Sequence, residues 1–187
     1  MKMLTHKNLF IQLSYPIALL FILTCLIGCN NKKRSSDGQY YTSTRVEGTN
    51  NIYLEAQDFK GVILPSDSTN LNYLGLKEFT PTEEEIFKAE RIFQRCLNID
   101  KIGIDSISID KDELRPLPKY IRQYAGMYND AGQKIITLYC IYEPRPEETD
   151  EWKKRIIMIR DGGNSVFSIS INITTEGCFH FSINSIA

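Results

Sequence analysis

The sequence is poor in histidine, and this shortage limits the chemistry that it can support. Only two histidines are present, and His180 is the one that lies beyond the N-terminal segment. Metal sites built from several histidines are therefore excluded, and a Ser-His-Asp or Cys-His catalytic arrangement would depend on His180 alone. No phosphate-binding loop, dinucleotide-binding fingerprint, nucleophile elbow or catalytic carboxylate pair can be recognised either.

An excess of positive charge is also missing. The chain contains 22 Lys and Arg against 23 Asp and Glu, for a formal net charge of −1. Removing residues 1–28, which carry Lys2 and Lys7 and no carboxylate, takes away two positive charges and changes the total to −3. Because nucleic-acid-binding domains normally carry a basic surplus, nucleic acid is excluded as a partner.

Cysteine is scarce after residue 29, where Cys96, Cys140 and Cys178 remain. Their spacing matches no zinc-binding pattern. An odd number allows at most one disulfide and leaves one thiol over. We expect at least two of the three to be ordinary buried side chains.

The sequence does contain a strong N-terminal signal. An apolar run from Leu9 to Ile27 follows Lys2 and Lys7 and ends in Leu26-Ile27-Gly28-Cys29. This order is typical of a bacterial lipoprotein signal peptide, which is cleaved in front of the lipidated cysteine. We therefore predict that residues 1–28 are a signal peptide. Cys29 is the predicted lipidation site, with a diacylglyceryl thioether and an N-linked acyl chain such as palmitate.

Two alternatives to lipidation remain, an uncleaved membrane anchor and an ordinary signal peptide. The apolar run approaches the roughly 20 residues that span a bilayer. Cleavage at Cys29 is favoured because Gly28 is small and Leu26 is aliphatic. Cys25 is a weaker candidate, since Thr24 precedes it.

Residues 29–51 are predicted to be a polar tether. They are rich in Ser, Thr, Asn, Lys and Arg and have few aliphatic side chains, so they cannot bury enough apolar surface to fold alone. The basic run 32–34 would lie well against anionic lipid headgroups. Residues 52–187 are then predicted to form a single domain, which a strand-like segment over 52–64 opens.

The clearest element is a helix over 81–97. Thr80 is the expected N-cap, Pro81 occupies the first position, and Glu83 has the capping-box spacing. The apolar face repeats at helical spacing and consists of Ile86, Ala89, Phe93, Cys96 and Leu97.

A series of antiparallel strands is predicted after the helix. Residues 134–142 are apolar on both faces, which places them in the centre of a sheet. Segments 155–160 and 165–173 are expected to form a hairpin around the turn Asp161-Gly162-Gly163-Asn164. In the last strand, 178–183, we expect Phe179, Phe181 and Ile183 to face inward. A short strand is expected at 107–109, and residues 120–128 fit either a helix or a strand.

These elements predict an α+β fold in which one N-terminal helix packs on a curved antiparallel β-meander. Such an arrangement buries the apolar faces of both elements in two layers. Its style is that of the cystatins, by analogy of element order alone.

Several short strings carry a resemblance to known proteins. They are the run from Phe79 to Glu85, the run from Ile121 to Gly126, and the run from Asp161 to Phe167 with the C-terminal Ile183–Ala187. Over roughly residues 79–187 the chain resembles small uncharacterised lipoproteins of the Bacteroidetes, a resemblance that implies an envelope location and one domain but no activity. Surface-exported lipoproteins of that group tend to carry an acidic cluster after the cysteine. Its absence here favours a periplasm-facing position.

Four other segments are candidate sites, and a structural role explains each of them better. Asp161–Asn164 has the residues of a turn. The acidic runs 147–151 and 110–113 lack the ligand spacing and the glycine of calcium loops. Cys178 and His180 could meet on one strand face as a thiolate and an imidazolium, but an exposed histidine on a terminal strand is the simpler interpretation.

An aromatic stripe is the fourth candidate. It consists of Tyr120, Tyr124 and Tyr128 with Arg122, together with Trp152. These side chains could stack on a sugar or hold a peptide, but packing within the fold explains them better.

The sequence thus predicts a lipid-anchored, periplasm-facing, non-enzymatic domain that binds a protein, peptide or glycan through its sheet face or hairpin tips, for instance as an inhibitor. The alternatives are a small-molecule-binding or enzymatic domain with a pocket between helix and sheet, and an accessory subunit of an envelope complex. No catalytic residue, cofactor or metal ligand is predicted, and Cys29 is the only functional residue.

Overall fold

The computed structural model describes residues 32–66, 77–97, 114–142, 150–157 and 159–184. They belong to one compact unit, residues 32–187. Its strands are β1 (Lys33–Arg34), β2 (Tyr40–Arg45), β3 (Ile52–Ala56), β4 (Lys60–Ile63), β5 (Glu78–Phe79), β6 (Tyr120–Tyr128), β7 (Lys134–Tyr142), β8 (Val166–Asn172) and β9 (Gly177–Ile183). Its helices are α2 (Glu83–Leu97) and α3 (Glu151–Lys154), with 3-10 turns at Leu117–Lys119 and Gly163–Ser165.

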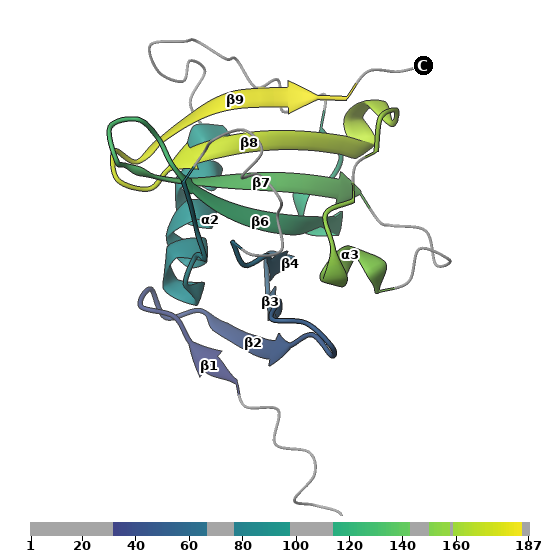
Figure 1. Ribbon diagram of the computed structural model, residues 1–187. Coiled ribbons are helices and arrows are strands. Elements are labelled where there is room, and N and C mark those ends of the chain that lie inside the picture. The colour runs from purple at the N-terminus through teal and green to yellow at the C-terminus, as the bar shows by residue number, and fades with distance from the viewer. Residues whose placement is uncertain (1–31, 67–76, 98–113, 143–149, 158, 185–187) are drawn as a thin grey trace, which may run out of the picture. The chain divides into compact units, whose positions relative to one another are not determined.

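The described strands form one large open sheet in the order β1-β2-β3-β4-β6-β7-β8-β9 (Figure 1). β5 pairs with the second half of β6, on the side where β4 pairs with the first half. β4 and β6 run parallel, and the other pairs are antiparallel. β7 lies between β6 and β8, which confirms the central position predicted for residues 134–142.

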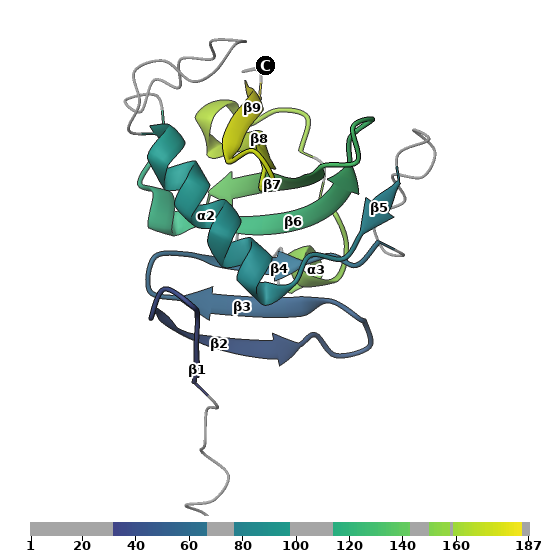
Figure 2. The ribbon, with the colours of Figure 1, turned by 90° about the vertical axis from the view of Figure 1, so that its left-hand side faces the viewer.

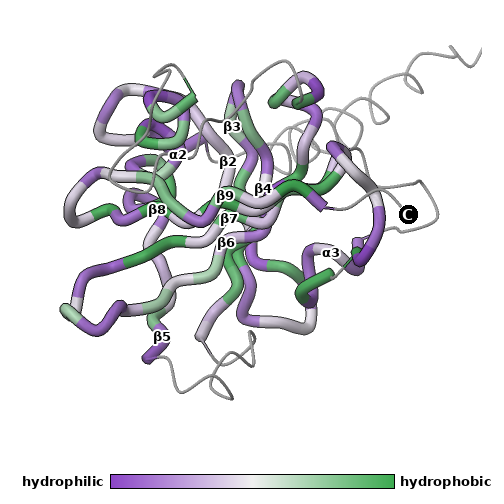
Figure 3. The backbone as a smooth tube through the Cα atoms, turned by 90° about the horizontal axis from the view of Figure 1, so that it is seen from above, coloured by the Kyte–Doolittle hydropathy of each residue, from purple (hydrophilic) through white to green (hydrophobic). Residues whose placement is uncertain are grey.

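Both faces of the sheet are covered. Helix α2 crosses one face, as Figure 2 shows, and buries the larger hydrophobic cluster. The other face packs against Trp152 of α3 and the following Ile156, Ile157 and Ile159. Figure 3 shows apolar residues where β4, β6 and β7 run through the middle of the unit, whereas many of the turns are hydrophilic.

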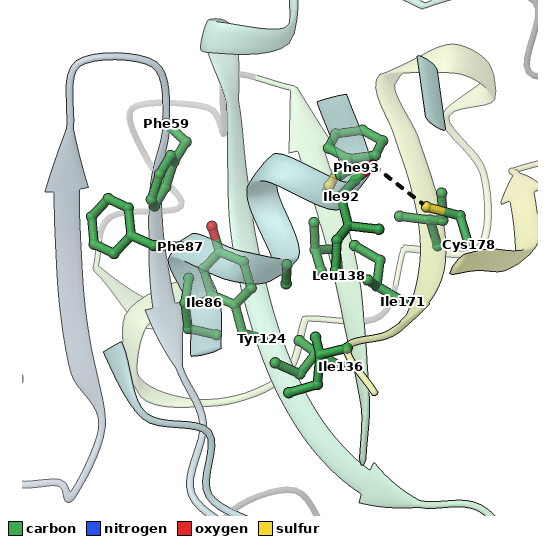
Figure 4. Packing of buried hydrophobic residues seen from close by; sticks show 14 of the residues in the cluster. Phe59, Ile86, Phe87, Ile92, Phe93, Tyr124, Ile136, Leu138, Ile171 and Cys178 are labelled. Atoms are coloured by element: carbon green, nitrogen blue, oxygen red, sulfur yellow. Dashed lines mark hydrogen bonds between the residues drawn. The ribbon is translucent and has the colours of Figure 1, made fainter. Parts of the chain in front are cut away.

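The core between α2 and the sheet contains both aliphatic and aromatic side chains (Figure 4). Ile92 of the helix lies near Leu138 and Ile171 of the sheet, and Phe59 and Phe87 gather beside Tyr124. The predicted apolar face of the helix is therefore confirmed. Burial of these side chains is the main stabilising contribution of the fold.

The predicted start of the helix is wrong by two residues. The capping box is formed by Thr82 and Glu85, because the Glu85 N–H donates to Thr82 Oγ1 at 3.2 Å and the Thr82 N–H donates to Glu85 Oε2 at 2.9 Å. Two overlapping Thr-x-x-Glu strings occur here, and the sequence alone did not distinguish them. Glu83 is thereby free to bind another part of the chain.

The predicted tether over 29–51 is wrong from residue 33 onward, since β1 and β2 belong to the sheet. β2 pairs with β3 from Tyr41–Ala56 to Arg45–Ile52. The Tyr41 side chain is buried against Phe87, with ring centroids 4.6 Å apart. These polar strands could not fold alone, but they can extend a sheet whose core is already formed.

The predicted hairpin around residues 161–164 is also wrong. β8 has β7 on one side and β9 on the other, so no ladder position remains for residues 155–160. Residues 155–157 are held by Gln123 instead, whose Nε2 donates to the Arg155 carbonyl at 2.7 Å and whose Oε1 accepts from the Ile157 N–H at 3.0 Å. Gly163–Ser165 form a 3-10 turn that leads into β8.

The predicted facing of the last strand holds only in its second half. The pairing of β8 with β9 shifts register between Ser168 and Ser170, and His180 has a positive φ of 51°. This β-bulge inserts one residue and inverts the alternation. Phe181 and Ile183 pack against the core as predicted, whereas Cys178 is buried and Phe179 lies opposite Ser170.

A mixed α and β architecture is confirmed, but its finer description is not. Among the described residues five strands precede α2, so the helix is not N-terminal, and the parallel β4–β6 pair makes the sheet mixed. Residues 120–128 form a strand, and residues 52–64 form the hairpin β3–β4. Residues 129–132 form the turn between β6 and β7, in which the Gly132 N–H donates to the Asn129 carbonyl at 2.8 Å. The strand predicted at 107–109 lies outside the described residues.

Candidate functional site

A pocket of about 350 Å³ lies between helix α2 and the β3–β4 hairpin. Its floor is apolar and includes Phe59, Phe87 and Ile92, and its rim is polar. A second hollow, lined by Arg45 to Asn50, follows the β2–β3 turn. Only the first pocket contains a buried charged side chain, Glu90, and it is therefore the candidate site.

Glu90 reaches the pocket from the apolar face of α2. It follows Ile86 by four residues and precedes Phe93 by three, so helical spacing places it among buried side chains. Its side chain is 6% exposed. The Tyr124 hydroxyl donates to Glu90 Oε1 at 2.7 Å, and Arg122 Nε lies 3.0 Å from the same oxygen.

Arg122 supports this carboxylate from the sheet. Tyr120, Arg122 and Tyr124 alternate along β6 and all face the helix. The Arg122 side chain is 1% exposed, and its terminal nitrogens donate to the carbonyls of Tyr120 at 3.1 Å and Leu117 at 3.5 Å. The Arg122 Nε contact with Glu90 is ionic, because the N–H is not aligned with the oxygen.

Burial and charge shift the pKa values of this cluster. Burial raises the pKa of Glu90, while the Arg122 charge and the Tyr124 hydrogen bond act in the opposite direction. For Arg122, burial lowers the pKa, but the charge of Glu90 and its neighbours raises it above the ordinary value. Burial and Glu90 also raise the pKa of Tyr124, which therefore acts as a hydrogen-bond donor.

One oxygen of Glu90 remains available to a ligand. Oε1 takes both contacts, and none of the described residues donates a hydrogen bond to Oε2. Glu90 is thus a buried carboxylate on the lining of a mostly apolar hollow. Such a site favours a ligand that inserts a hydroxyl, an amide N–H or an ammonium group.

The rim of the pocket carries both signs of charge. Arg91 pairs with Asp37 at 2.9 Å, and Arg95 and Lys88 both approach Glu176, at 2.7 and 3.2 Å. A rim of this kind gives no long-range attraction for one sign of charge. Recognition at the pocket would depend on shape and on Glu90.

The other residues singled out in the sequence have structural roles. The aromatic stripe is divided: Tyr120 and Tyr124 lie in the core under α2, whereas Trp152 packs on the opposite face of the sheet. Tyr128 is half-buried beside Phe79. The expectation that these side chains serve in packing is confirmed for the three buried ones.

Asn164 in the segment 161–164 anchors a turn. Its carbonyl accepts a hydrogen bond from the Tyr120 hydroxyl, and its side-chain oxygen accepts one from Arg115 Nε at 3.2 Å. Of the acidic runs, Asp150 and Glu151 pair with Lys153 and Lys154 at the start of α3. Residues 110–113 and 147–149 lie outside the described part of the chain.

Of the three cysteines in the described part of the chain, Cys96 and Cys178 form a disulfide, and Cys140 is a buried free thiol. The limit of one disulfide is confirmed, whereas the expectation of two ordinary cysteines is wrong. Because Cys178 is bonded to the helix, it cannot pair with His180 as a nucleophile. Burial raises the pKa of the Cys140 thiol far above its usual value, which makes it unreactive.

The residues that the structure describes also lack two other features. They contain no group of three or more His, Cys, Asp or Glu side chains placed to hold a metal ion. Within the same residues, no helix has the length and apolar character needed to cross a membrane. Cys29 and residues 1–28 lie outside this part of the chain.

The Glu90–Arg122 pair was not predicted from the sequence, although it left a signal. Glu90 interrupts the apolar face of α2, and Arg122 lies between two tyrosines at the period of a strand. A carboxylate and a guanidinium on two apolar faces that must meet are expected to pair, because an unpaired buried charge is costly.

No protein-family model matches this chain, and neither a curated protein nor a solved structure is significantly similar to it.

Proposed function

We propose that this protein is a lipid-anchored, periplasm-facing binding protein of the bacterial cell envelope, without enzymatic activity. The sequence Leu26-Ile27-Gly28-Cys29 supports the anchor. The Cys96–Cys178 disulfide supports export, because disulfides form and persist mainly in oxidising compartments.

The observation that carries the binding function is the buried Glu90, which lines the 350 Å³ pocket and whose Oε2 accepts no hydrogen bond from the described residues. The Arg122 and Tyr124 contacts hold this oxygen in place before a ligand arrives, which reduces the entropy lost on binding. The partner is a protein, peptide or glycan that inserts a hydrogen-bond donor beside helix α2. Inhibition of an envelope enzyme is one form of this function, by analogy with the helix-on-sheet style of cystatins.

A binding role agrees better with the described side chains than catalysis does. Cys140 is buried with a raised pKa, Cys178 is in the disulfide, and Tyr124 holds its proton tightly. A buried thiol and a bonded sulfur are unsuited as nucleophiles, and a tyrosine with a raised pKa is unsuited as an acid.

The anchor is tested by the intact mass of the native protein from membranes. We expect the loss of residues 1–28 and a mass increase for a diacylglyceryl group and an acyl chain on Cys29. A Cys29→Ser variant should lack this modification and remain uncleaved. An intact N-terminus, or a cleaved chain without lipid, would refute the anchor.

The pocket is tested with a photo-crosslinking amino acid at Gln94, on its rim, in the full chain in its native host. Ser182 on β9 is the matched control position, because it is exposed and does not line the pocket. We expect a discrete adduct from position 94 that is lost in an Asp58→Arg variant, which places a large cation at the pocket. Equal adducts from both positions, or an adduct insensitive to Asp58→Arg, would contradict the proposal.

A small-molecule ligand is the second candidate. It is favoured by the volume of the pocket, because ligand-binding cavities start at about 300 Å³ and this pocket exceeds that size. Native mass spectrometry of the purified protein distinguishes the two. A retained ligand mass that disappears in the Asp58→Arg variant would favour the small molecule, whereas a protein adduct at Gln94 would favour a macromolecular partner.

A further inference from the structure

The folded unit begins very close to the predicted lipidation site. Four peptide units separate Cys29 from Lys33, the first residue of β1, and four extended residues span at most about 14 Å. The headgroup region on each side of a bilayer is about 5 to 8 Å thick. If Cys29 carries lipid, β1 must therefore lie at or near the membrane surface.

β1 and β2 are not free to move away from the rest of the fold. Lys33 Nζ contacts both oxygens of Glu83, at 2.8 and 3.0 Å. The same carboxylate accepts hydrogen bonds from the Tyr41 hydroxyl at 2.7 Å and Ser43 Oγ at 2.5 Å. Since Glu83 begins α2, a short connection to the lipid would restrict the orientation of the whole unit.

This edge exposes a basic and aromatic surface. Lys32 and Arg34 are exposed, and Tyr40, which pairs with Arg34 in the ladder, is 63% exposed. The Arg34 guanidinium lies 5.6 Å from the centre of the Tyr40 ring. Tyr40 has the largest exposure among the described hydrophobic side chains. Tyrosine and basic residues together are typical of protein surfaces at the membrane–water interface.

The acidic side chains near this edge are occupied by partners within the fold. Asp37 and Glu83 form ion pairs with Arg91 and Lys33, which compensate their charge, whereas Glu84 has only a hydrogen bond from the Ser36 N–H, at 3.3 Å. Lys32 and Arg34 therefore supply the positive charge that faces outward.

We propose, resting on the lipid anchor proposed above, that Lys32, Arg34 and Tyr40 form a docking surface for anionic phospholipid headgroups. The surface need not bind strongly, because the anchor holds it at a high effective concentration next to the bilayer. It fixes the orientation of the unit, with β1 toward the membrane and β9, the opposite end strand, away from it (Figure 1).

The test uses the mature lipoprotein in vesicles, with a spin label at Thr42→Cys or at Ser182→Cys. Thr42 lies on β2, two residues from Tyr40 on the same face, and Ser182 lies on β9. The introduced thiol is the accessible one, because Cys96 and Cys178 are bonded and Cys140 is buried. The readout is the collision rate of each label with a water-soluble relaxation agent.

In vesicles containing phosphatidylglycerol, we expect the label at 42 to be shielded and the label at 182 to stay exposed. Charge reversal by Lys32→Glu and Arg34→Glu should lower the ratio of docked to undocked protein at least tenfold at physiological salt. At low salt, where charges are screened less, the reduction should reach about a hundredfold. Neutral phosphatidylcholine vesicles should have a similar effect. The matched variant Arg45→Glu, at the other end of β2, should leave the shielding unchanged.

Equal exposure of both labels in lipidated protein would overturn the docking surface while leaving the anchor intact. Shielding at 42 that persists after charge reversal or in neutral vesicles would also overturn it. The intact mass of the same sample separates these results from failure of the anchor: without lipid on Cys29, both proposals fall.

Discussion

Helix α2 is attached to the two end regions of the sheet in different ways. At its N-terminal end, Glu83 binds β1 and β2 through an ion pair and hydrogen bonds. At its C-terminal end, Cys96 is covalently bonded to Cys178 of β9. The first attachment depends on ionisation and the second on oxidation.

The region around β1 and β2 and the region around β9 should therefore respond to different conditions. Burial raises the pKa of Glu83, but the hydrogen bonds from Lys33, Ser43 and Tyr41 together bring it below the ordinary value. A lowered carboxyl pKa contributes stability that is present above the unfolded value, 4.5, and is lost as the pH falls through the folded value. Acid should therefore loosen β1 and β2, and a reductant should loosen β9.

The largest expected effect comes from breaking the disulfide. Cys96 and Cys178 are 82 residues apart, and closing a loop of that length stabilises the folded state by about 4 kcal/mol in the chain-entropy model. Reduction, or the double variant Cys96→Ala/Cys178→Ala, should lower the free energy of unfolding in urea by that amount. Hydrogen exchange should accelerate in β9 more than in β2.

The double variant is its own control, because a reductant should not change its stability further. If the unmodified protein unfolded at the same urea concentration with and without reductant, the attachment of the C-terminal end of α2 to β9 would not depend on the disulfide.

A smaller loss of folding stability is expected when a glycine of β4 is replaced, and a glycine of β9 serves as the comparison. A Cβ on Gly61 of β4 would lie 2.5 Å from a ring carbon of Tyr124 and 2.6 Å from the Arg122 carbonyl oxygen. Gly61→Ala should therefore cost about 2 kcal/mol of folding stability, since strands β4 and β6 must move apart.

Gly177→Ala on β9 is the matched substitution, because a Cβ there has only Thr175 Oγ1 nearby, at 3.9 Å. It should change the stability by less than about 0.5 kcal/mol. Urea titrations of both variants check the pair, and equal losses would mean that close packing of β4 on β6 is not what distinguishes them.

The smallest effect is expected from the carboxylates. Glu83→Gln should lower the stability by about 1 kcal/mol at neutral pH, because its ion pair is partly exposed. Exchange of the amide hydrogens of β1 and β2 should accelerate, and the loss should shrink as the pH falls below 4.5, where Glu83 of the unmodified protein also becomes protonated.

Glu176→Gln is the corresponding change near β9, where Arg95 and Lys88 lower the pKa of Glu176. It should leave exchange in β9 unchanged, because the disulfide still holds that strand. If Glu176→Gln accelerated exchange in β9 more than Glu83→Gln accelerated it in β2, the expected difference between the two attachments would be contradicted.

The sequence predicted elements whose pattern repeats within one segment. The apolar spacing from Ile86 to Leu97 located the body of α2, and apolar residues on both faces of 134–142 located the centre of the sheet. Both signals arise from burial, which depends on the side chains of the element itself.

Features set by distant partners could not be predicted in this way. β1 and β2 are polar, and only their pairing with β3 makes them strands, although the run Tyr40–Thr44 has the tyrosines and threonines favoured in strands. Because of the bulge at His180, Cys178 faces the core and not the outer side of the sheet. It therefore reaches Cys96 of the helix and forms the disulfide that the sequence did not predict. The pocket depends on Glu90 and Arg122, which are 32 positions apart in the sequence.

The bulge at His180 also bears on how molecules of this protein behave when crowded together. A long, flat end strand is a template on which a neighbouring molecule can add its own strand, the first step of aggregation. β9 is seven residues long, but the positive φ of His180 interrupts its regular hydrogen-bonding edge. At the other end of the sheet, β1 offers only two residues. The bulge therefore protects the β9 end of the sheet, whereas at the other end β1 covers only Tyr40 and Tyr41, and among the described residues Thr42–Arg45 of β2 have no strand on their outer side.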